Sequence, residues 1–369
     1  MITVAGSETF VGMDLFAGAG GLSYGLSSAG FNMRLGIEVD PHCADTLKTN
    51  FPGMRVVRSD IRSLDPTKTA KIAGIDPLVL DLIAGGPPCQ GFSQSNHRTR
   101  SMTNPLNLLF LEYFRFVNVL RPKLFLFENV EGLRTIDHGT VVQEILNICK
   151  KLGYFVEWKV INAEDYGVPQ KRRRIIFIGT RSCTDSKSFF EIRKEVKITV
   201  REAIFDLPVL ENGNTIDAQN YQIGQGLSEY QDLMRQNNND LIRNNLLTKS
   251  SDLVIKRYKH VPQGGNWADI PSTLMSNYKN TSNTHKWIYH RLKWDDSSIG
   301  ISNFRKNMLI HPSQDRGLSV REAARLQSFP DQYLFKGPLG AQQQQVANAV
   351  PPLVSEKIGR GLIEYLVAS

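Results

Sequence analysis

Near its start the chain reads Phe10-Val-Gly-Met-Asp-Leu-Phe-Ala-Gly-Ala-Gly-Gly-Leu-Ser23. The apolar residues up to Phe16 predict a strand, and the glycines after it predict a tight turn into a helix over 22–28. Glycine lets the backbone approach a ligand closely, and a helix that begins there offers free N–H groups to that ligand. The stretch therefore favours an α/β domain that binds a ligand at this turn.

The rest of the first 180 residues continues the alternation of short apolar runs and helix-like stretches. The run Leu124-Phe-Leu-Phe127 is apolar at every position, which is typical of a strand buried on both faces of a sheet. We therefore predict a doubly wound α/β sheet with ligands at the carboxyl ends of its strands. The predicted strands cover 10–16, 34–39, 55–58, 78–84, 124–128, 155–161 and 174–180, and the predicted helices cover 22–28, 41–50, 106–120 and 140–152.

Past Ser182 this alternation fails. Residues 211–250 are rich in Asn and Gln, and residues 260–320 are loop-like, so we predict a second, smaller, irregular domain and assign it no strands. Helical periodicity returns at 319–328 and at 351–366. The predicted domains are therefore 1–181 and 182–318, with 319–369 returning to the first domain and its last helix packing there.

The composition is that of a folded globular protein. The chain has 369 residues, of which 41% are hydrophobic and 22% charged, and this excludes disordered and disulfide-scaffold proteins. Its four cysteines form no Cys-x-x-Cys pair, which argues against a structural zinc site. Residues 1–10 show no basic start or long apolar stretch, and Asp81 interrupts the apolar run 78–84, so we expect no signal peptide and no membrane span.

The formal net charge of +8 is unevenly distributed. Residues 1–90 hold seven Lys and Arg against nine Asp and Glu, a net charge of −2, whereas residues 91–320 hold 32 against 23, a net charge of +9. A polyanionic substrate would meet the middle of the chain, although an ordinary solvated surface explains the charge equally well.

Acidic residues end the second and third predicted strands. Glu38 lies 20 residues after Gly18, where an acid can bind ribose hydroxyls. The turn reads Gly-x-Gly-x-x-Ser and follows Asp14, so a nucleoside cofactor fits it better than a dinucleotide, and a purely structural turn stays open. Asp60 could contact an adenine amino group or cap a helix.

The sequence Gly85-Gly-Pro-Pro-Cys89-Gln-Gly-Phe-Ser93 follows the fourth predicted strand directly. Two prolines and the flanking glycines fix a turn that presents Cys89 at the ligand-bearing edge of the sheet, as a nucleophile requires. The other three cysteines are interpreted as small core residues. Residues 90–107 offer little to pack and predict a mobile loop.

Two further elements fall on the same edge. Glu128-Asn-Val130 closes the buried fifth strand, where burial would raise the pKa of the Glu128 carboxyl. Gln170-Lys-Arg-Arg-Arg174 introduces the last strand, and Arg172 and Arg174 would share one face if they follow the period of a strand. That face could line the pocket or be solvated surface.

Taken together, these motifs resemble those of DNA (cytosine-5)-methyltransferases, and the resemblance covers nearly the whole chain. Six motifs occur in the family's order, at 14–23, 85–93, 128–130, 170–174, 321–331 and 345–352. The resemblance implies a Rossmann-like, mostly parallel methyltransferase fold, S-adenosyl-methionine as methyl donor without a metal, and a cytosine flipped out of double-stranded DNA. It also implies that 182–318 is the target-recognition segment, and that the charged residues of 321–331 organise that segment rather than catalyse.

The resemblance also implies the roles of the catalytic residues. Cys89 would add to C6 of the cytosine, Glu128 would contact N3 and the exocyclic amine, and Arg172, with Arg174 beside it, would stabilise charge on the O2 side. Gln90, Ser93 and Ser95 would lie in the loop that closes over the DNA, where one of the serines could enter the space that the base leaves. The implied cofactor residues are Asp14, Phe16, Gly18, Gly20, Glu38, Asp60 and Asn348.

Two alternative functions stay open. A relative with the same chemistry could methylate cytosine in tRNA, although the Cys-Phe-Thr signature of such relatives is missing here. A catalytically inactive DNA-binding relative is the other alternative, although Cys89, Glu128 and Arg172 are all present. The resemblance further implies a bacterial-type, cytoplasmic, nucleoid-associated monomer, with a cognate restriction endonuclease as a functional partner.

Overall fold

The computed structural model describes residues 9–88, 109–182, 188–191, 195–222, 226–236, 241–278, 287–302 and 304–369. The contacts within the chain divide it into two compact units. Unit 1 comprises Met1–Asn162, Arg173–Lys194 and Val350–Ser369, and unit 2 comprises Ala163–Arg172 and Glu195–Ala349.

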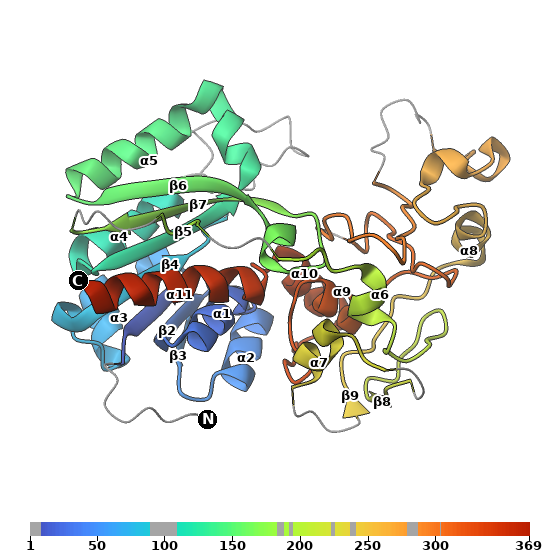
Figure 1. The fold of residues 1–369 in the computed structure, drawn as a ribbon, viewed down its shortest axis with the longest axis horizontal. Coiled ribbons are helices and arrows are strands. Elements are labelled where there is room, and N and C mark those ends of the chain that lie inside the picture. The colour runs from blue at the N-terminus through green and yellow to red at the C-terminus, as the bar shows by residue number, and fades with distance from the viewer. Residues whose placement is uncertain are drawn as a thin grey trace. The chain divides into compact units, whose positions relative to one another are not determined.

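In the described part of the chain, unit 1 is built on one seven-stranded sheet in the order β3-β2-β1-β4-β5-β7-β6 (Figure 1). The first five strands run parallel, and β7 runs antiparallel to both β5 and β6. The strands are β1 (Val11–Leu15), β2 (Asn32–Glu38), β3 (Arg55–Arg58), β4 (Leu80–Gly85), β5 (Leu124–Val130), β6 (Phe155–Asn162) and β7 (Arg173–Thr180). The strand order reverses between β1 and β4, and in sheets of this class ligands bind at such a reversal, beyond the carboxyl ends of the strands.

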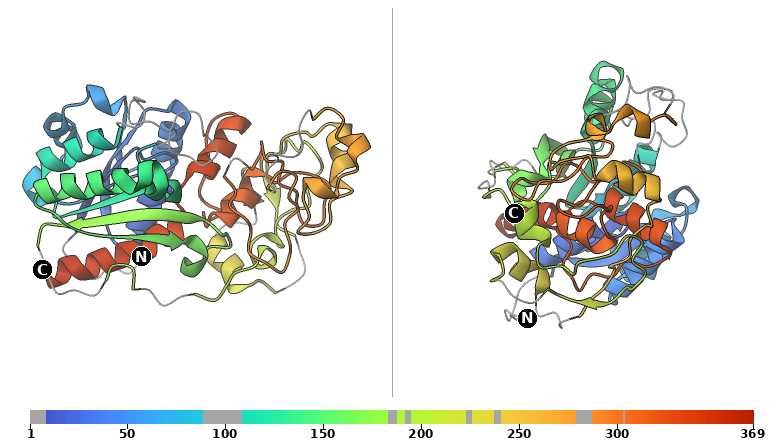
Figure 2. Two further views of the ribbon diagram at one scale, coloured as in Figure 1. Left: turned by 90° about the horizontal axis from the view of Figure 1, so that it is seen from above. Right: turned by 90° about the vertical axis from the view of Figure 1, so that its right-hand side faces the viewer.

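Helices flank both faces of this sheet (Figure 2). They are α1 (Gly21–Ala29), α2 (Pro41–Asn50), α3 (Pro66–Ile72), α4 (Leu109–Leu120), α5 (Thr140–Lys151) and α11 (Pro352–Ala368), with short 3₁₀ turns η1 (Ile61–Ser63), η2 (Pro77–Val79) and η5 (Glu131–Gly139). The short helix α3 was not predicted from the sequence. Asp65 caps this helix and Pro66 is its first residue, and this pair of residues is a common signature of a helix N-terminus.

The last helix returns to unit 1 and packs on α1. A Cβ atom at Gly25 would lie 2.2 Å from the Pro352 carbonyl oxygen, and one at Gly359 would lie 2.8 Å from the Ala29 side chain. Glycine at both positions therefore lets the two helices approach each other closely. The prediction that the C-terminal helix folds back on the first domain agrees with this packing.

The core of unit 1 is centred on strands β4 and β5. Every residue of β4 and all of β5 except Val130 are buried, as the uninterrupted apolar run predicted. Tyr113 of α4 donates its hydroxyl to the carbonyl oxygens of Ile83 and Leu126, so its buried polar group is satisfied by both strands. The predicted doubly wound, mostly parallel sheet is confirmed.

Unit 2 is largely irregular in its described residues. Its helices are α6 (Val200–Ile204), α7 (Glu229–Arg235), α8 (Asp252–Tyr258), α9 (Val320–Leu326) and α10 (Leu339–Asn348), and its 3₁₀ turns are η6 (Ala163–Tyr166), η7 (Trp267–Asp269) and η8 (Ser272–Leu274). Strands β8 (Gln219–Asn220) and β9 (Leu241–Ile242) form a short antiparallel pair. Compactness here comes from side-chain interactions rather than from regular layers.

Buried arginines hold α9 inside unit 2. Arg325 pairs with both Asp206 and Asp331, at 3.1 and 2.6 Å. Arg321 donates to the carbonyl oxygens of Arg243, Pro330 and Tyr333. Residues 319–349 therefore belong to unit 2, and the chain returns to unit 1 at Val350, later than the predicted boundary at 319. The reason is that these guanidinium groups find their partners in 203–244 and 330–333, which a sequence pattern does not reveal.

Candidate active site

The glycine turn after β1 has the backbone conformation that its sequence predicted. Phe16, Gly18 and Gly20 have φ angles of 60°, 54° and 80°, in the left-handed region that glycine tolerates best. For Phe16 this conformation costs free energy, so the turn is held by its surroundings. Gly20 N–H donates to Ala17 O at 2.8 Å, which closes the turn at the start of α1.

Asp14 is fully buried at the end of β1. Its Oδ2 accepts a hydrogen bond of 2.5 Å from the Ser23 hydroxyl, whereas its Oδ1 is buried without a hydrogen-bond partner among the described residues. Burial raises the pKa of the Asp14 carboxyl to about 7, against the opposing hydrogen bond from Ser23. Asp14, two residues before the turn begins at Phe16, thus keeps one buried acceptor that no described residue uses.

Glu38 at the end of β2 is tied to this turn. Its Oε2 accepts from Gly18 N–H at 2.8 Å, and its Oε1 accepts from the N–H groups of Val39 and Asp40, also at 2.8 Å. Burial raises the pKa of the Glu38 carboxyl, and these hydrogen bonds oppose the shift. The two residues that the Gly-to-acid spacing linked are therefore in direct contact. The next residue, Val39, is 62% exposed, an apolar surface that the sequence pattern did not single out.

Asp60 behaves as a cap. It follows β3, accepts from Arg62 N–H at 2.9 Å as the N-cap of η1, and forms an ion pair with the Arg62 guanidinium at 2.5 Å. The hydrogen bonds from Arg62 lower the pKa of the Asp60 carboxyl. Of the two sequence interpretations, the structure shows the helix cap.

The turn after β4 lies against the end of β5. Asn129 donates from Nδ2 to the Pro87 carbonyl oxygen at 3.1 Å. A Cβ atom at Gly86 would lie 2.8 Å from Glu128 Oε2, so only glycine leaves room for the carboxylate there. Pro87 and Pro88, the two residues before Cys89 in the sequence, are thereby held beside the end of β5. Cys89 itself, Gln90, Ser93, Ser95 and the predicted loop 90–107 lie outside the described residues.

Glu128 pairs with Arg174 across β5 and β7. The Arg174 Nε atom lies 3.0 Å from Glu128 Oε1, and the two side chains are only 16% and 11% exposed. The antiparallel register sets Val130 opposite Arg174, which brings the two strand ends together. Burial lowers the pKa of the Arg174 guanidinium, and the charge of Glu128 opposes that shift. Such a partly desolvated pair can present one acceptor and several donors to a ligand.

The other predicted arginine has a different environment. Strand β7 begins at Arg173, so Arg172 precedes the strand and belongs to unit 2. Its Nη2 donates to the carbonyl oxygens of Ala347 and Ala349, both at 3.0 Å. Because these carbonyls end α10, Arg172 caps the C-terminus of that helix, where a cation is favourable. Arg173 between them is exposed and pairs with Glu131 at 2.8 Å.

Asn348 is the last residue of α10 and is exposed within unit 2. Its Oδ1 accepts from Gln344 Nε2 at 2.7 Å. Among the described residues, His, Cys, Asp and Glu side chains form no group of three or more that could hold a metal ion. The same part of the chain contains no helix long and apolar enough to cross a membrane.

Comparisons with known proteins agree on one family. The model of the C-5 cytosine-specific DNA methylases matches residues 10–364. The chain is 36% identical over 354 residues to the type II methyltransferase M1.HphI of Haemophilus parahaemolyticus, covering 95% of this chain and 86% of that protein. It is 33% identical over 388 residues to the type II methyltransferase M.DdeI of Desulfomicrobium norvegicum, with 96% and 88% covered.

A solved structure shows the same architecture. A protein assigned as a DNA modification methyltransferase encoded within an E. coli prophage superimposes with a TM-score of 0.79 at 26% identity, and the match covers 97% of this chain and 100% of that chain.

Proposed function

Because the chain belongs to the C-5 cytosine-specific DNA methylase family, and so methylates C5 of cytosine in DNA, we propose that its cytosine pocket forms around Glu128. The observation that carries this proposal is the convergence of three groups in unit 1. Glu128 pairs with Arg174, and the same end of β5 holds the Pro87 carbonyl of the turn that leads into Cys89. A carboxylate and a guanidinium at one strand edge, beside the turn whose sequence continues to a cysteine, suit addition to a pyrimidine ring.

In the proposed mechanism, Cys89 is the nucleophile. Cytosine C5 is a weak nucleophile, and addition of the Cys89 thiolate to C6 makes the electron pair of the C5–C6 bond available at C5. Glu128 binds N3 and the exocyclic amine. It thereby favours the protonated ring, which is the form that accepts the thiolate. C5 would then take the methyl group that the sulfonium donor supplies, the donor leaving as a neutral thioether, and removal of the C5 proton by a base would expel the thiolate and restore the double bond. Since C5 is covered in a stacked duplex, the base must first be flipped out.

We assign the contact on the O2 side of the base to Arg174 rather than to Arg172. Arg174 is the arginine that pairs with Glu128, whereas Arg172 uses its Nη2 to cap α10. The resemblance implied Arg172 for this role, with Arg174 beside it. Arg172 is in this proposal a positioning residue, and Arg174 the catalytic one.

The family uses S-adenosyl-methionine, which supplies an electrophilic methyl group when bound. The turn after β1 fits such a nucleoside. Asp14 Oδ1 is an unused buried acceptor, Gly18 and Gly20 leave the backbone open to close approach, and Glu38 is positioned beside them. Exposed Val39 would cover one face of the adenine ring. Phe16 of the same turn completes the proposed set.

The remaining assignments concern DNA and its surroundings. We propose that 182–318 reads the target sequence in double-stranded DNA, and that Gln90, Ser93 and Ser95 close over the flipped base. Type II methyltransferases among the relatives support a restriction endonuclease as the functional partner of this chain. The enzyme is proposed to act as a monomer on DNA in the bacterial cytoplasm, at the nucleoid.

A duplex that contains 5-fluorocytosine tests the mechanism, because fluorine at C5 prevents the elimination that releases the enzyme. Bisulfite sequencing of DNA from cells that express the chain first identifies the methylated site. On that site the wild-type protein should form a covalent adduct that mass spectrometry maps to Cys89, and Cys89→Ala should form none. An adduct at another residue, or methylation retained by Cys89→Ala, would refute the nucleophile. A parallel assay with unmodified tRNA should show no transfer.

A further inference from the structure

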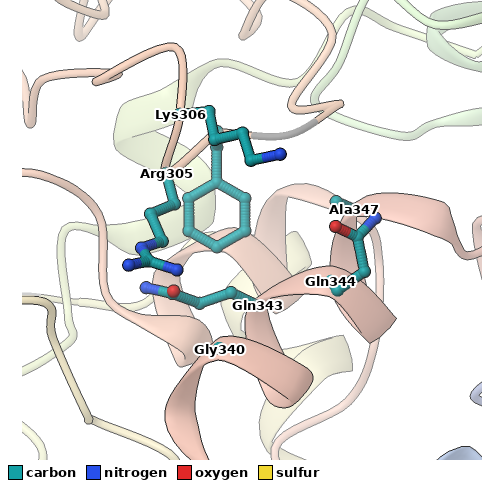
Figure 3. Close-up of a pocket in the computed structure, with 7 residues that line it drawn as sticks. Arg305, Lys306, Gly340, Gln343, Gln344 and Ala347 are labelled. Carbon is teal, nitrogen blue, oxygen red and sulfur yellow. The ribbon is translucent and has the colours of Figure 1, made fainter.

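A small groove in unit 2 lies between a turn of the chain and one face of α10 (Figure 3). Its volume of about 40 Å³ admits a few water-sized groups, and a nucleoside is too large for it. One wall follows the i, i+3, i+4, i+7 spacing of a single helix face. The lining residues are Gly340, Gln343, Gln344 and Ala347 on α10, and Phe304, Arg305 and Lys306 on the turn.

The groove carries two positive charges and no carboxylate. Arg305 and Lys306 are exposed, and within the described residues neither side chain has an ion pair or a hydrogen bond. A Cβ atom at Gly340 would lie 3.7 Å from Arg305 Nη1, so the guanidinium lies directly over the helix. Figure 3 shows the Arg305 guanidinium beside Gln343, with Lys306 extending from the same turn. Both cations are therefore available to an anionic ligand.

The walls of the groove are held in place before any ligand arrives. Phe304 is 2% exposed and anchors the turn that carries both cations. The Gln343 amide is bonded to the Thr248 hydroxyl, and Gln344 donates to Asn348. Each amide NH₂ has a second N–H group that can donate a hydrogen bond to a ligand. The turn and the helix face are therefore preformed, and binding has to order only the Arg305 and Lys306 side chains.

We propose that this groove binds a phosphate of the DNA backbone, with Arg305 and Lys306 supplying the charge. The inference rests on the proposed function, since DNA is the polyanion that the enzyme must hold. A phosphodiester presents two non-bridging oxygens, which match the fork of an arginine and the amide donors beside it. The small volume admits these oxygens and excludes a base, so the contact carries position rather than sequence.

The groove is also linked to the segment that leads into β7. Arg172 donates from Nη1 to the Ser302 hydroxyl of the turn at 3.4 Å, and from Nη2 to Ala347 O and Ala349 O of α10. One arginine thus joins both walls, two residues before Arg174. A phosphate in the groove would stabilise the arrangement that Arg172 maintains.

The salt dependence of DNA binding tests the proposal. Wild type and the double variant Arg305→Gln/Lys306→Gln are titrated by fluorescence anisotropy with a labelled mixed-sequence duplex over a range of KCl concentrations. Each lost phosphate contact reduces the magnitude of the slope of log K against log[salt] by about 0.9, and the groove holds one phosphate, so the double variant should lose about 0.9. The matched control Arg55→Gln/Lys71→Gln removes two exposed cations from unit 1 and should keep the wild-type slope. An unchanged slope in the groove variant would overturn the proposal.

Two further readouts separate the possible failures. With saturating duplex at low salt, the groove variant should methylate with nearly the wild-type kcat and a raised KM for DNA. If the wild type does not methylate, the proposed function fails while the salt slope still tests the groove. Inorganic phosphate at constant ionic strength tests for a free-anion site by NMR. Saturable shifts at 304–306 and 340 at micromolar phosphate would assign the groove to the free anion and reject the DNA contact.

Discussion

The Arg174 guanidinium lies 3.0 Å from the Glu128 carboxylate, across the antiparallel pair of β5 and β7. This contact orients the carboxylate at the strand edge beside the turn that leads into Cys89. The neighbouring arginines have other partners, since exposed Arg173 pairs with half-buried Glu131 and Arg172 caps α10.

We expect Arg174→Gln to lower the rate of methyl transfer by about 100-fold or more, the usual cost of removing one donor that stabilises developing charge. Single-turnover transfer of labelled methyl groups to DNA measures this rate. The control Arg173→Gln should stay within a few-fold of wild type because its side chain is 59% exposed. Equal losses in the two variants would contradict the distinction between these arginines.

Asn129→Ala should loosen the turn before Cys89. The variant removes the hydrogen bond to Pro87 O, whose loss leaves a buried carbonyl unsatisfied at a cost of about 1–3 kcal/mol. We expect slower adduct formation with 5-fluorocytosine DNA, whereas binding of S-adenosyl-methionine, measured by calorimetry, should be unchanged. Adduct formation at the wild-type rate would show that the hydrogen bond does not position the thiol.

Asp14 predicts a pH dependence of stability. Its pKa is about 7 in the folded protein against 3.8 as a reference. The folded state therefore binds more protons than the unfolded state in this window, and the free energy of unfolding falls as pH rises through it. Asp14→Asn removes the titration. Urea unfolding of the two cofactor-free proteins is compared at pH 5, 6 and 7. The free energy of unfolding of the variant, relative to that of the wild type, should rise by about 1 kcal/mol per pH unit. A constant difference would contradict the assignment.

Glu322 predicts the opposite dependence in unit 2. Burial opposes its ionisation, but the Arg316 charge at 2.7 Å outweighs burial and lowers the pKa of Glu322 to about 2. The ionised Glu322 therefore stabilises the folded protein fully above pH 4.5, the reference pKa of its carboxyl. This contribution to the free energy of unfolding is lost as pH falls toward 2.

Glu322→Gln leaves Arg316 buried without its ion pair and should cost about 3–5 kcal/mol at pH 7. Thermal or urea unfolding measures the loss. The control Glu356→Gln breaks an exposed helical pair with Arg360 and should cost at most about 0.5 kcal/mol. Comparable losses in the two variants would show that the buried pair contributes no more than a surface one.

Local sequence patterns were sufficient to predict the scaffold, and the resemblance to a known family implied the reaction. The apolar run 124–127 forms the doubly buried strand that its pattern predicted, and the glycines at 18 and 20 take the left-handed conformations that their turn requires. The acid 20 residues after Gly18 does reach the Gly18 N–H. These features depend on residues close together in the chain or on the edge that parallel strands share, and a sequence pattern contains that information.

Other features depend on partners that are distant in the chain. Which arginine meets Glu128 follows from the register of β5 against β7 and from the residue at which β7 begins. Arg321 and Arg325 hold α9 in unit 2 because their acceptors lie in 203–244 and 330–333. Asp60 forms an ion pair with Arg62. The groove beside Arg305 exists because the turn at 304–306 lies over α10. A charged side chain can satisfy its donors with many partners, and only packing in three dimensions selects among them.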